Sequence, residues 1–193
     1  MPDNTWKEYF EKTKGAKHRP LLVEAIKLVK EKNKALDLGA GAFNDIKYIL
    51  SEGFKHVVAV DKVSVAEDIL KNLLPAQVSY VISRFEDFEF VENNYDLVNA
   101  QYSLPFIEKN SFNKVFEKIL SSLKSGGVFN GQFFGDRDEW NKGDDKMTFH
   151  TKEEAENLLK GLKVIKFVEE EKNGSTASGQ DKHWHVFHFI VVK

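Results

Sequence analysis

The sequence contains no cysteine, and this absence excludes several kinds of chemistry at the outset. Without thiols the chain forms no disulfide, uses no thiolate nucleophile and offers no cysteine ligand to a metal. No apolar run approaches the ~20 residues that span a bilayer, and the first residues lack a secretory signal pattern. We therefore expect a soluble, cytoplasmic protein with no membrane partner.

An excess of charge of one sign is also missing. The chain has 28 Lys and Arg against 30 Asp and Glu, which gives a formal charge of −2. Such a balance creates no overall field that would recruit nucleic acid. A solvated helix face explains the basic stretch between Lys7 and Arg19 at least as well as a local anion site does. We expect no nucleic-acid partner.

Short apolar segments alternate with helical patterns through the first two thirds of the chain. The predicted strands are 35–38, 56–60, 78–82, 97–100 and 128–134, and the helices between them are 44–50, 65–73 and 112–123. Near-continuous apolar strands that alternate with helices are typical of a parallel sheet covered on both faces. A chain of 193 residues suits one such domain.

The C-terminal part breaks this alternation. After a helix expected at 152–159, the segments LKVIKFVEEE (162–171) and HWHVFHFIVVK (183–193) are joined by a turn-rich stretch with no helix. Two strands joined in this way must pair antiparallel. The expected fold is α/β: a Rossmann-like, doubly wound, seven-stranded sheet, mostly parallel, with an antiparallel C-terminal hairpin. It should occupy residues 20–193, and residues 1–19 should form an N-terminal lid segment.

Two glycines follow the first predicted strand in LDLGAG (36–41). A dinucleotide fingerprint needs a third glycine, but Asn44 stands at that position, and no G-K-[ST] follows to make a phosphate-binding loop. Asp37 would repel a pyrophosphate but suits an ammonium group. Asp61, about 20 residues after the turn, is placed to bind a ribose diol. The pattern favours S-adenosyl-L-methionine (SAM) over simple turn glycines with Asp61 as a helix N-cap.

The same segments resemble a known family. ALDLGAGAFND and VVAVDKV resemble motifs I and II of class I SAM-dependent methyltransferases, and YDLVNAQYSLPF and LKSGGVFNGQFFG resemble their fourth- and fifth-strand motifs. The similarity covers 6–192. More narrowly, FGDRDEW, TFHTKEEAENLL and KHWHVFHFIV resemble a subfamily of small bacterial methyltransferases akin to the tellurite-resistance methyltransferase group.

This resemblance implies which residues bind the cofactor. Gly39 and Gly41 would let the backbone approach SAM, and Asp61 would hold the ribose hydroxyls. The segment that follows the fourth strand would lie beside the cofactor. A separate hypothesis, which does not come from the resemblance, is that the N-terminal lid folds over the cofactor and places its cations, Arg19 among them, near the methionine carboxylate. The full expected set is Arg19, Asp37, Gly39, Ala40, Gly41, Asp61, Lys62, Phe85, Glu86, Asn99 and Gln101.

One position departs from the family pattern. In SRFED (83–87), Arg84 stands where the family usually places an acid that accepts from the adenine amino group. Adenine recognition would then fall to backbone groups near Phe85, or to Glu86 or Asp87.

The acceptor is expected at the carboxyl ends of the strands, where open α/β sheets bind ligands. The longest segment there, 134–150, exceeds the usual loop of ~4–6 residues, which indicates either a functional loop or a surface excursion. Aromatic faces suit a sulfonium and contribute roughly 0.5–2 kcal/mol each, although core packing explains Phe134 equally well. The candidate substrate residues are Tyr9, Tyr102, Phe134, Arg137, Trp140 and His150.

No catalytic base is identifiable from the sequence. His150 and His183 are candidates to titrate near neutrality. His183 and His185 share one side of a strand, but no acid accompanies them in it, so polar-face histidines are favoured over a metal site. We expect no metal.

The function expected is methyl transfer from SAM to a small molecule, by a monomer or weak homodimer. The segment QYSL (101–104) stands where enzymes that methylate amino groups of nucleic acids or proteins carry an N-P-P-Y-like tetrad. Two alternatives stay open: a non-catalytic SAM-binding sensor and, less favoured because of Asn44 and the hairpin, an NAD-type oxidoreductase.

Overall fold

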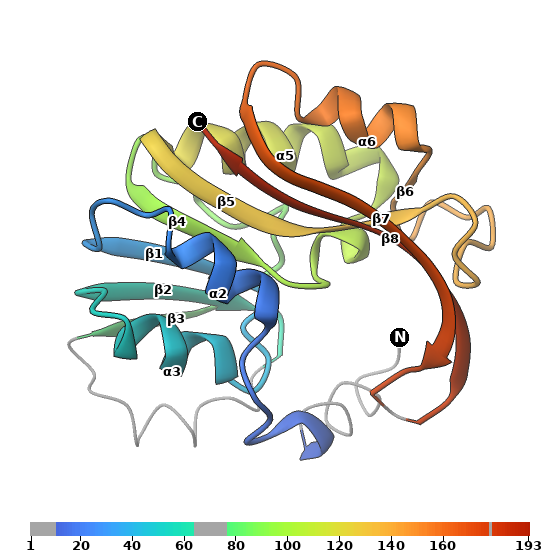
Figure 1. Cartoon of the computed structure of the whole chain (residues 1–193), viewed down its shortest axis with the longest axis horizontal. Coiled ribbons are helices and arrows are strands. Elements are labelled where there is room, and N and C mark those ends of the chain that lie inside the picture. The colour runs from blue at the N-terminus through green and yellow to red at the C-terminus, as the bar shows by residue number, and fades with distance from the viewer. Residues whose placement is uncertain (1–10, 64–76, 178) are drawn as a thin grey trace.

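A mixed sheet forms the centre of the computed structural model, which describes residues 11–63, 77–177 and 179–193. The strand order is β3-β2-β1-β4-β5-β8-β7, and a short strand, β6, pairs with β5 off this path (Figure 1). The strands are β1 Lys34–Leu38, β2 His56–Asp61, β3 Val78–Ile82, β4 Tyr95–Ala100, β5 Leu123–Gly135, β6 Phe149–His150, β7 Lys163–Ser175 and β8 Asp181–Val192. The predicted fold class is confirmed, with β6 as an addition inside the long segment after β5.

The pairing directions follow from the connections. Strands β1 to β5 pair in parallel, because helices or long loops join them. Strand β8 pairs antiparallel with both β5 and β7. The C-terminal hairpin expected from the sequence is therefore present.

Helices cover both faces of this sheet. Those described are α2 Pro20–Ile26, α3 Asn44–Ser51, α5 Lys109–Ser122 and α6 Lys152–Leu158, with a 3-10 turn, η2, at Leu104–Phe106. Helix α2 starts at a proline, whose missing N–H costs nothing there. Helix α6 has a capping box between Thr151 and Glu154. The helix expected at 65–73 lies outside the described residues.

Two apolar clusters stabilise the layers. Alternate residues of each strand point to opposite faces, so Ala35 packs with α2 and α3 while Leu36 packs with α5. The α5 side also buries Phe129 and Phe133 from β5. This alternation fixes which polar residues of the same strands share the α2/α3 face.

Strands β7 and β8 continue past the point where β8 stops pairing with β5. Strand β8 pairs with β5 only from Val186 to Val192, whereas its pairing with β7 continues to Asp181. Residues 181–185 therefore extend beyond the carboxyl end of β5, and Figure 1 shows the two strands curving away from the sheet there. We call this extension, formed by 170–175 and 181–185, the hairpin arm. Within the described ranges, no helix has the length and apolar character needed to cross a membrane.

Candidate cofactor and acceptor site

Three buried polar side chains interrupt the apolar α2/α3 face of the sheet. Asp37, Asn99 and Asn130 lie on the adjacent strands β1, β4 and β5, and their Cα atoms are partners in the register. Asn99 Nδ2 donates to Asp37 Oδ1 at 2.6 Å, and Asn130 Nδ2 donates to Asn99 Oδ1 at 2.8 Å. Because buried polar groups need partners, this row of three is held in one arrangement.

The row continues toward the edge of the sheet through two glutamines. Gln101 Nε2 donates to Asn99 Oδ1 at 2.9 Å, and Gln132 Nε2 donates to Gln101 Oε1 at 2.9 Å. Gln132 Oε1 in turn accepts the backbone N–H of Tyr102 at 2.7 Å. Tyr102 has φ +56°, a left-handed conformation that a non-glycine residue adopts at a cost. Together these bonds connect Asp37 to the end of β4.

Asp37 has an unusual charge environment. Its pKa is raised to about 8, mainly by burial and also by nearby Asp45, while the hydrogen bond from Asn99 lowers it. Asp45 is held by the backbone N–H of Arg19 at 2.9 Å. Asn99 Nδ2 donates to Asp45 Oδ2 at 3.2 Å as well as to Asp37, so one amide group bonds to both carboxyl groups. A ligand ammonium placed there would stabilise the ionised form of Asp37.

The glycine turn lies directly beside this carboxyl pair. Gly39 has φ +82°, and a Cβ on it would lie 2.5 Å from Ser103 Cβ, so both backbone conformation and space require glycine. Gly41, with φ +46°, donates its N–H to Asp61 Oδ2 at 2.9 Å. Asp61 Oδ1 accepts from the N–H of Val63 at 3.1 Å. Asp61 therefore joins the two loops and still has lone pairs on both oxygens for a ligand hydroxyl.

The other expected cofactor residues near the turn are Ala40, Lys62, Phe85 and Glu86, which lie in the loops after β1, β2 and β3. Ala40 is buried in the turn, and Lys62 is exposed next to Asp61. Arg84 Nη2 pairs with Glu86 Oε1 at 3.2 Å and with Glu108 Oε1 at 2.8 Å, while Phe85 packs against the α5-side cluster. The acid expected to serve adenine is thus already engaged by Arg84.

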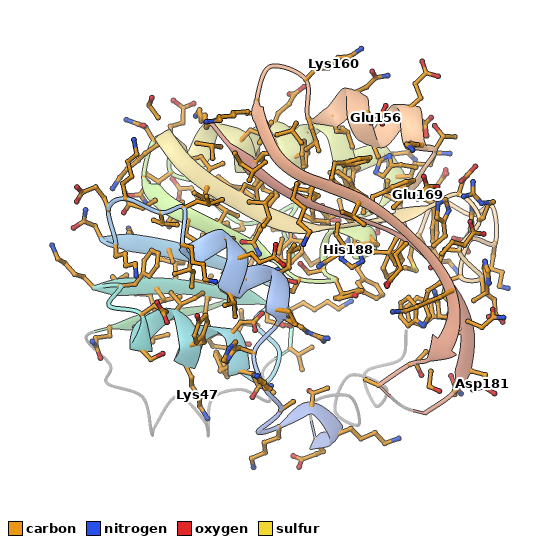
Figure 2. The ribbon with its side chains drawn as sticks, in the orientation of Figure 1. Lys47, Glu156, Lys160, Glu169, Asp181 and His188 are labelled. Atoms are coloured by element: carbon orange, nitrogen blue, oxygen red, sulfur yellow. The ribbon has the colours of Figure 1, made fainter. Side chains whose placement is uncertain are left out.

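A cavity of about 310 Å³ adjoins the glutamine end of the polar row. This volume is at the small end of the range for ligand pockets. Its walls come from the start of α2, the end of β4, and strands β5, β7 and β8. The lining residues are Arg19, Pro20, Leu21, Glu24, Gln101, Tyr102, Gln132, Lys166, Val168 and His188. In Figure 2, His188 lies between α2 and the hairpin arm, whose tip carries Asp181.

An aromatic cluster lies next to this cavity, under the hairpin arm. Phe134 contacts Tyr102, Trp140 and Trp184, with ring centroids 5.8–6.3 Å apart. The cluster already contains a cation, because Lys182 Nζ lies 3.7 Å from the Trp184 ring centroid. Lys182 also pairs with buried Asp138, at 2.5 and 2.6 Å. The structure therefore brings three of the expected substrate aromatics together, but partly as packing around its own ion pair.

Two other expected substrate residues lie away from the cavity. Arg137 bonds to Glu169 and Glu171 of β7, where the hairpin arm begins. His150 is buried against Phe112 and Phe133 on the α5 side of the sheet. Tyr9 lies outside the described residues. The hydrophobic periodicity of the sequence did not predict where Arg137 and His150 lie, because both belong to the long segment after β5, whose path does not follow from such a pattern.

One group of described residues offers potential metal ligands. Glu169, Glu171 and His185 bring ligand atoms within 4.8 Å of one another, and the acids come from β7, the strand beside the histidine. Arg137 Nη2 donates to the two carboxylates at 2.9 and 2.7 Å and lies 3.1 Å from His185 Nε2. The cation at this cluster is thus a side chain of the protein.

Comparison with known proteins agrees with this geometry. A family model described as a methyltransferase domain matches residues 35–127. A search of curated proteins found no match. Many solved structures match, and three illustrate the likeness.

The first is the 1,6-didemethyltoxoflavin-N1-methyltransferase of Burkholderia thailandensis, solved with 1,6-didemethyltoxoflavin and S-adenosylhomocysteine. It is 20% identical, with a TM-score of 0.66 over 91% of this chain and 77% of that chain. TehB from Haemophilus influenzae is 16% identical, with a TM-score of 0.74 over 89% of this chain and 61% of that chain. A SAM-dependent methyltransferase of Methanosarcina mazei is 15% identical, with a TM-score of 0.67 over 92% and 98% of the two chains.

These identities establish a shared fold, and the match over 35–127 adds the domain. The narrower resemblance to the tellurite-resistance group is supported only by the shared fold with TehB. The expectation of a methyltransferase that uses SAM is confirmed at the level of domain and fold. Residues 35–127 match the model of a methyltransferase domain, and the chain has the fold of the SAM-dependent methyltransferases.

Proposed function

We propose that this protein transfers the methyl group of SAM to a small molecule bound in the cavity beside α2. The observation that carries the proposal is the unbroken hydrogen-bonded row from Asp37 to Gln132. It joins the glycine turn, where the cofactor would lie, directly to the cavity wall. A displacement reaction requires above all that the methyl donor and the acceptor are aligned. A hydrogen-bonded row shared by both sites would hold the two molecules in fixed positions.

The cofactor fits the residues of the turn. Asp37 would take the ammonium group, which relieves the cost of its burial beside Asp45. Gly39 and Gly41 would admit the amino-acid tail close to the backbone, and Asp61 would hold the ribose hydroxyls. Asn130 Oδ1, buried and without a partner among the described residues, adds an acceptor next to this row. The other proposed contacts are Arg19, Ala40, Lys62, Phe85, Glu86, Asn99 and Gln101.

The bound cofactor supplies a methyl group on a sulfonium. The chain then has to hold the acceptor in line with it and exclude water, and alignment alone contributes up to ~7–11 kcal/mol. The cavity volume of about 310 Å³ and the even charge balance favour a small acceptor over a nucleic acid. Tyr102, which lines the cavity, is the proposed aromatic wall, and Phe134 is proposed to support its ring from behind, with centroids 6.3 Å apart.

The N-terminal segment 1–19 is proposed to act as a lid over the cofactor. Its described part is anchored at the start of α3, beside the glycine turn. Asn44 Nδ2 donates to Thr13 O at 2.8 Å, and the N–H of Arg19 donates to Asp45. Deletion of 1–16 should weaken SAM binding, and unchanged affinity would remove the lid role.

Calorimetry and a turnover screen test the proposed function. The protein should bind SAM and S-adenosylhomocysteine and should not bind NAD; Asp37→Ala should weaken SAM binding, while Asp144→Ala, at an exposed loop position, should not. Turnover should appear with at least one class among thiols, amines, hydroxy-aromatics, N–H heterocycles and oxyanions. A preference for NAD would contradict the proposal. Tight SAM binding without any turnover would favour a sensor.

A further inference from the structure

We propose that His188 is the general base of the methyl transfer, and that the acceptor is a small neutral molecule that loses a proton from oxygen or nitrogen. This inference rests on the proposed function. It concerns a residue of the cavity wall that the sequence did not single out.

The position of His188 relative to the polar row suits this role. Its Cα partner in the register is Gln132 of β5, and both residues line the cavity. His188 shares the α2/α3 face with Asn99, because Ile190, two residues further along β8, packs in the α2/α3 cluster. Neighbouring strands lie ~5 Å apart, so β8 is ~10 Å from β4. The Tyr102 ring at the end of β4 lies edge-on to the His188 ring, with centroids 6.3 Å apart, and the acceptor would lie in the cavity that both residues line.

A carboxylate orients the imidazole ring. His188 Nε2 lies 3.5 Å from Glu170 Oε2, and Glu170 is fixed by Lys172 at 2.9 Å. The proton of the neutral ring is therefore expected on Nε2, which leaves Nδ1 as the acceptor. Among the described residues, Nδ1 has no hydrogen-bond partner. Carboxylate, imidazole and substrate in this order form the usual arrangement of an oriented base.

The charges around His188 keep the ring neutral near neutral pH. Burial lowers its pKa, Glu170 opposes this, and Lys166 and Lys172 lower the pKa further. The other charged groups facing it are Arg19, which precedes α2, and Glu24 of α2, which pairs with Lys166 at 2.7 Å. A neutral imidazole is the form that accepts a proton.

The other histidines are placed elsewhere. His150 is buried on the α5 side, while His183 and His185 bond to the acids of β7. His56 contacts Ser79 Oγ, and His18 stacks on Tyr48. All six histidines lie in the described ranges, and the cavity beside α2 is lined by His188 alone among them.

The chemical step balances without a further reactant. A lone pair of the acceptor oxygen or nitrogen forms the bond to the methyl carbon, and the carbon–sulfur bond breaks with its electrons on sulfur. The acceptor proton passes to His188 Nδ1. The products are the methylated acceptor, S-adenosylhomocysteine and an imidazolium, which returns its proton to water.

The test compares His188→Gln with His183→Gln, a change of the same type on the same strand but on its other face. The probes are a series of ring-substituted phenols of graded acidity and a set of N–H heterocycles. We expect H188Q to keep its melting temperature and SAM affinity but to lose ~100-fold or more in kcat at pH 7. The loss should shrink for the most acidic phenols, which need no base. H183Q should match the wild type.

A second variant tests the orientation by Glu170. Loss of its carboxylate removes the group that raises the pKa of His188, so in Glu170→Gln the acidic limb of the kcat/KM profile should move to lower pH. A merely structural role would leave that limb in place. Wild-type kcat in H188Q, or turnover confined to acceptors without a proton to lose, such as thioethers or tellurite, would overturn the assignment of His188. An absence of turnover with every acceptor would overturn the proposed function and this inference with it.

Discussion

Asn99 donates its side-chain N–H to Asp37 at 2.6 Å across two neighbouring parallel strands, in the interior of an otherwise apolar sheet. The register makes the two residues Cα partners, so the contact is set by the backbone and not by a flexible loop. Such a buried carboxyl group is costly unless it is hydrogen-bonded or neutralised. Under the proposed function, the ammonium group of the cofactor would compensate the remaining cost of burying Asp37.

The first prediction concerns Asp37→Asn. The native pKa of about 8 lies above the ordinary value of 3.8, so the native state holds this proton more tightly than the unfolded chain does. Stability is therefore lost as pH rises from about 4 toward 8, and removal of the charge should abolish this loss. At pH 8 we expect the variant to be more stable by at least ~1 kcal/mol, or ~2–4 °C in melting temperature.

The same variant should bind SAM more weakly, because it lacks the charge that faces the ammonium group. Thermal denaturation at pH 5 and pH 8 and calorimetry with SAM check the two effects. Asp144→Asn, an exposed acid, is the control and should change neither. A variant that melts below the wild type at pH 8 would contradict the account of Asp37.

The second prediction concerns the glycine turn. Gly39→Ala adds a Cβ that would lie 2.5 Å from Ser103 Cβ in a backbone with φ +82°. The left-handed conformation and the clash together should lower the free energy of unfolding by about 2–4 kcal/mol. Gly53→Ala is the matched control, since Gly53 has φ +94° and nothing within 4 Å of the added Cβ. Urea denaturation should show a loss of only about 1–2 kcal/mol for the control. Equal losses would mean that Ser103 yields to the methyl group.

The third prediction concerns His150, whose Nε2 is buried without a partner among the described residues. Burial lowers its pKa to about 4, against an ordinary value of 6.5. The unfolded chain binds this proton more readily, so the contribution to stability falls as pH drops from 6.5 toward 4. Through His150, the free energy of unfolding of the wild type should fall by about 2 kcal/mol between pH 7 and pH 5. His150→Phe retains the ring contacts with Phe112 and Phe133 and should lack this fall.

Denaturation at the two pH values checks this expectation, with His56→Phe as a control for loss of a histidine elsewhere in the sheet. If H56F changed the pH dependence as much as H150F does, the effect would not belong to His150. Methyl transfer by H150F should be unchanged, because His150 packs on the face opposite the cavity. A large loss of kcat would restore His150 as a substrate residue.

The fourth prediction concerns the ion pair of Lys182 and Asp138, whose side chains are 1% and 0% exposed. Lys182→Met leaves a buried carboxylate unpaired and should cost about 3–5 kcal/mol. Adding Asp138→Asn should recover part of the loss, since it removes the buried charge and its amide oxygen can still accept one of the two N–H groups, of Trp140 and His185, that bond to the two carboxylate oxygens. Lys146→Met, at an exposed pair, should have no measurable effect. A double variant no more stable than the single one would show that the charge of Asp138 is not the cause.

The sequence by itself determined the strand alternation, the terminal hairpin and the glycine turn. These features depend on local chemistry: apolar runs that must be buried, a helix-free connection that forces antiparallel pairing, and glycines in left-handed conformations. For the same reason Asp37 and Asp61 could be proposed as cofactor residues from the sequence, since both lie within a few residues of a predicted strand end.

Only the tertiary structure decided which side chains meet at the cavity. The register of β8 against β5 places His188 beside Gln132, and a pairing register is a property of two strands together. The long segment after β5 sends Arg137 to the acids of β7 and His150 to the opposite face, because its path is set by packing against other elements. Periodicity along one chain says which face a residue takes, but the partner on that face comes from a distant segment.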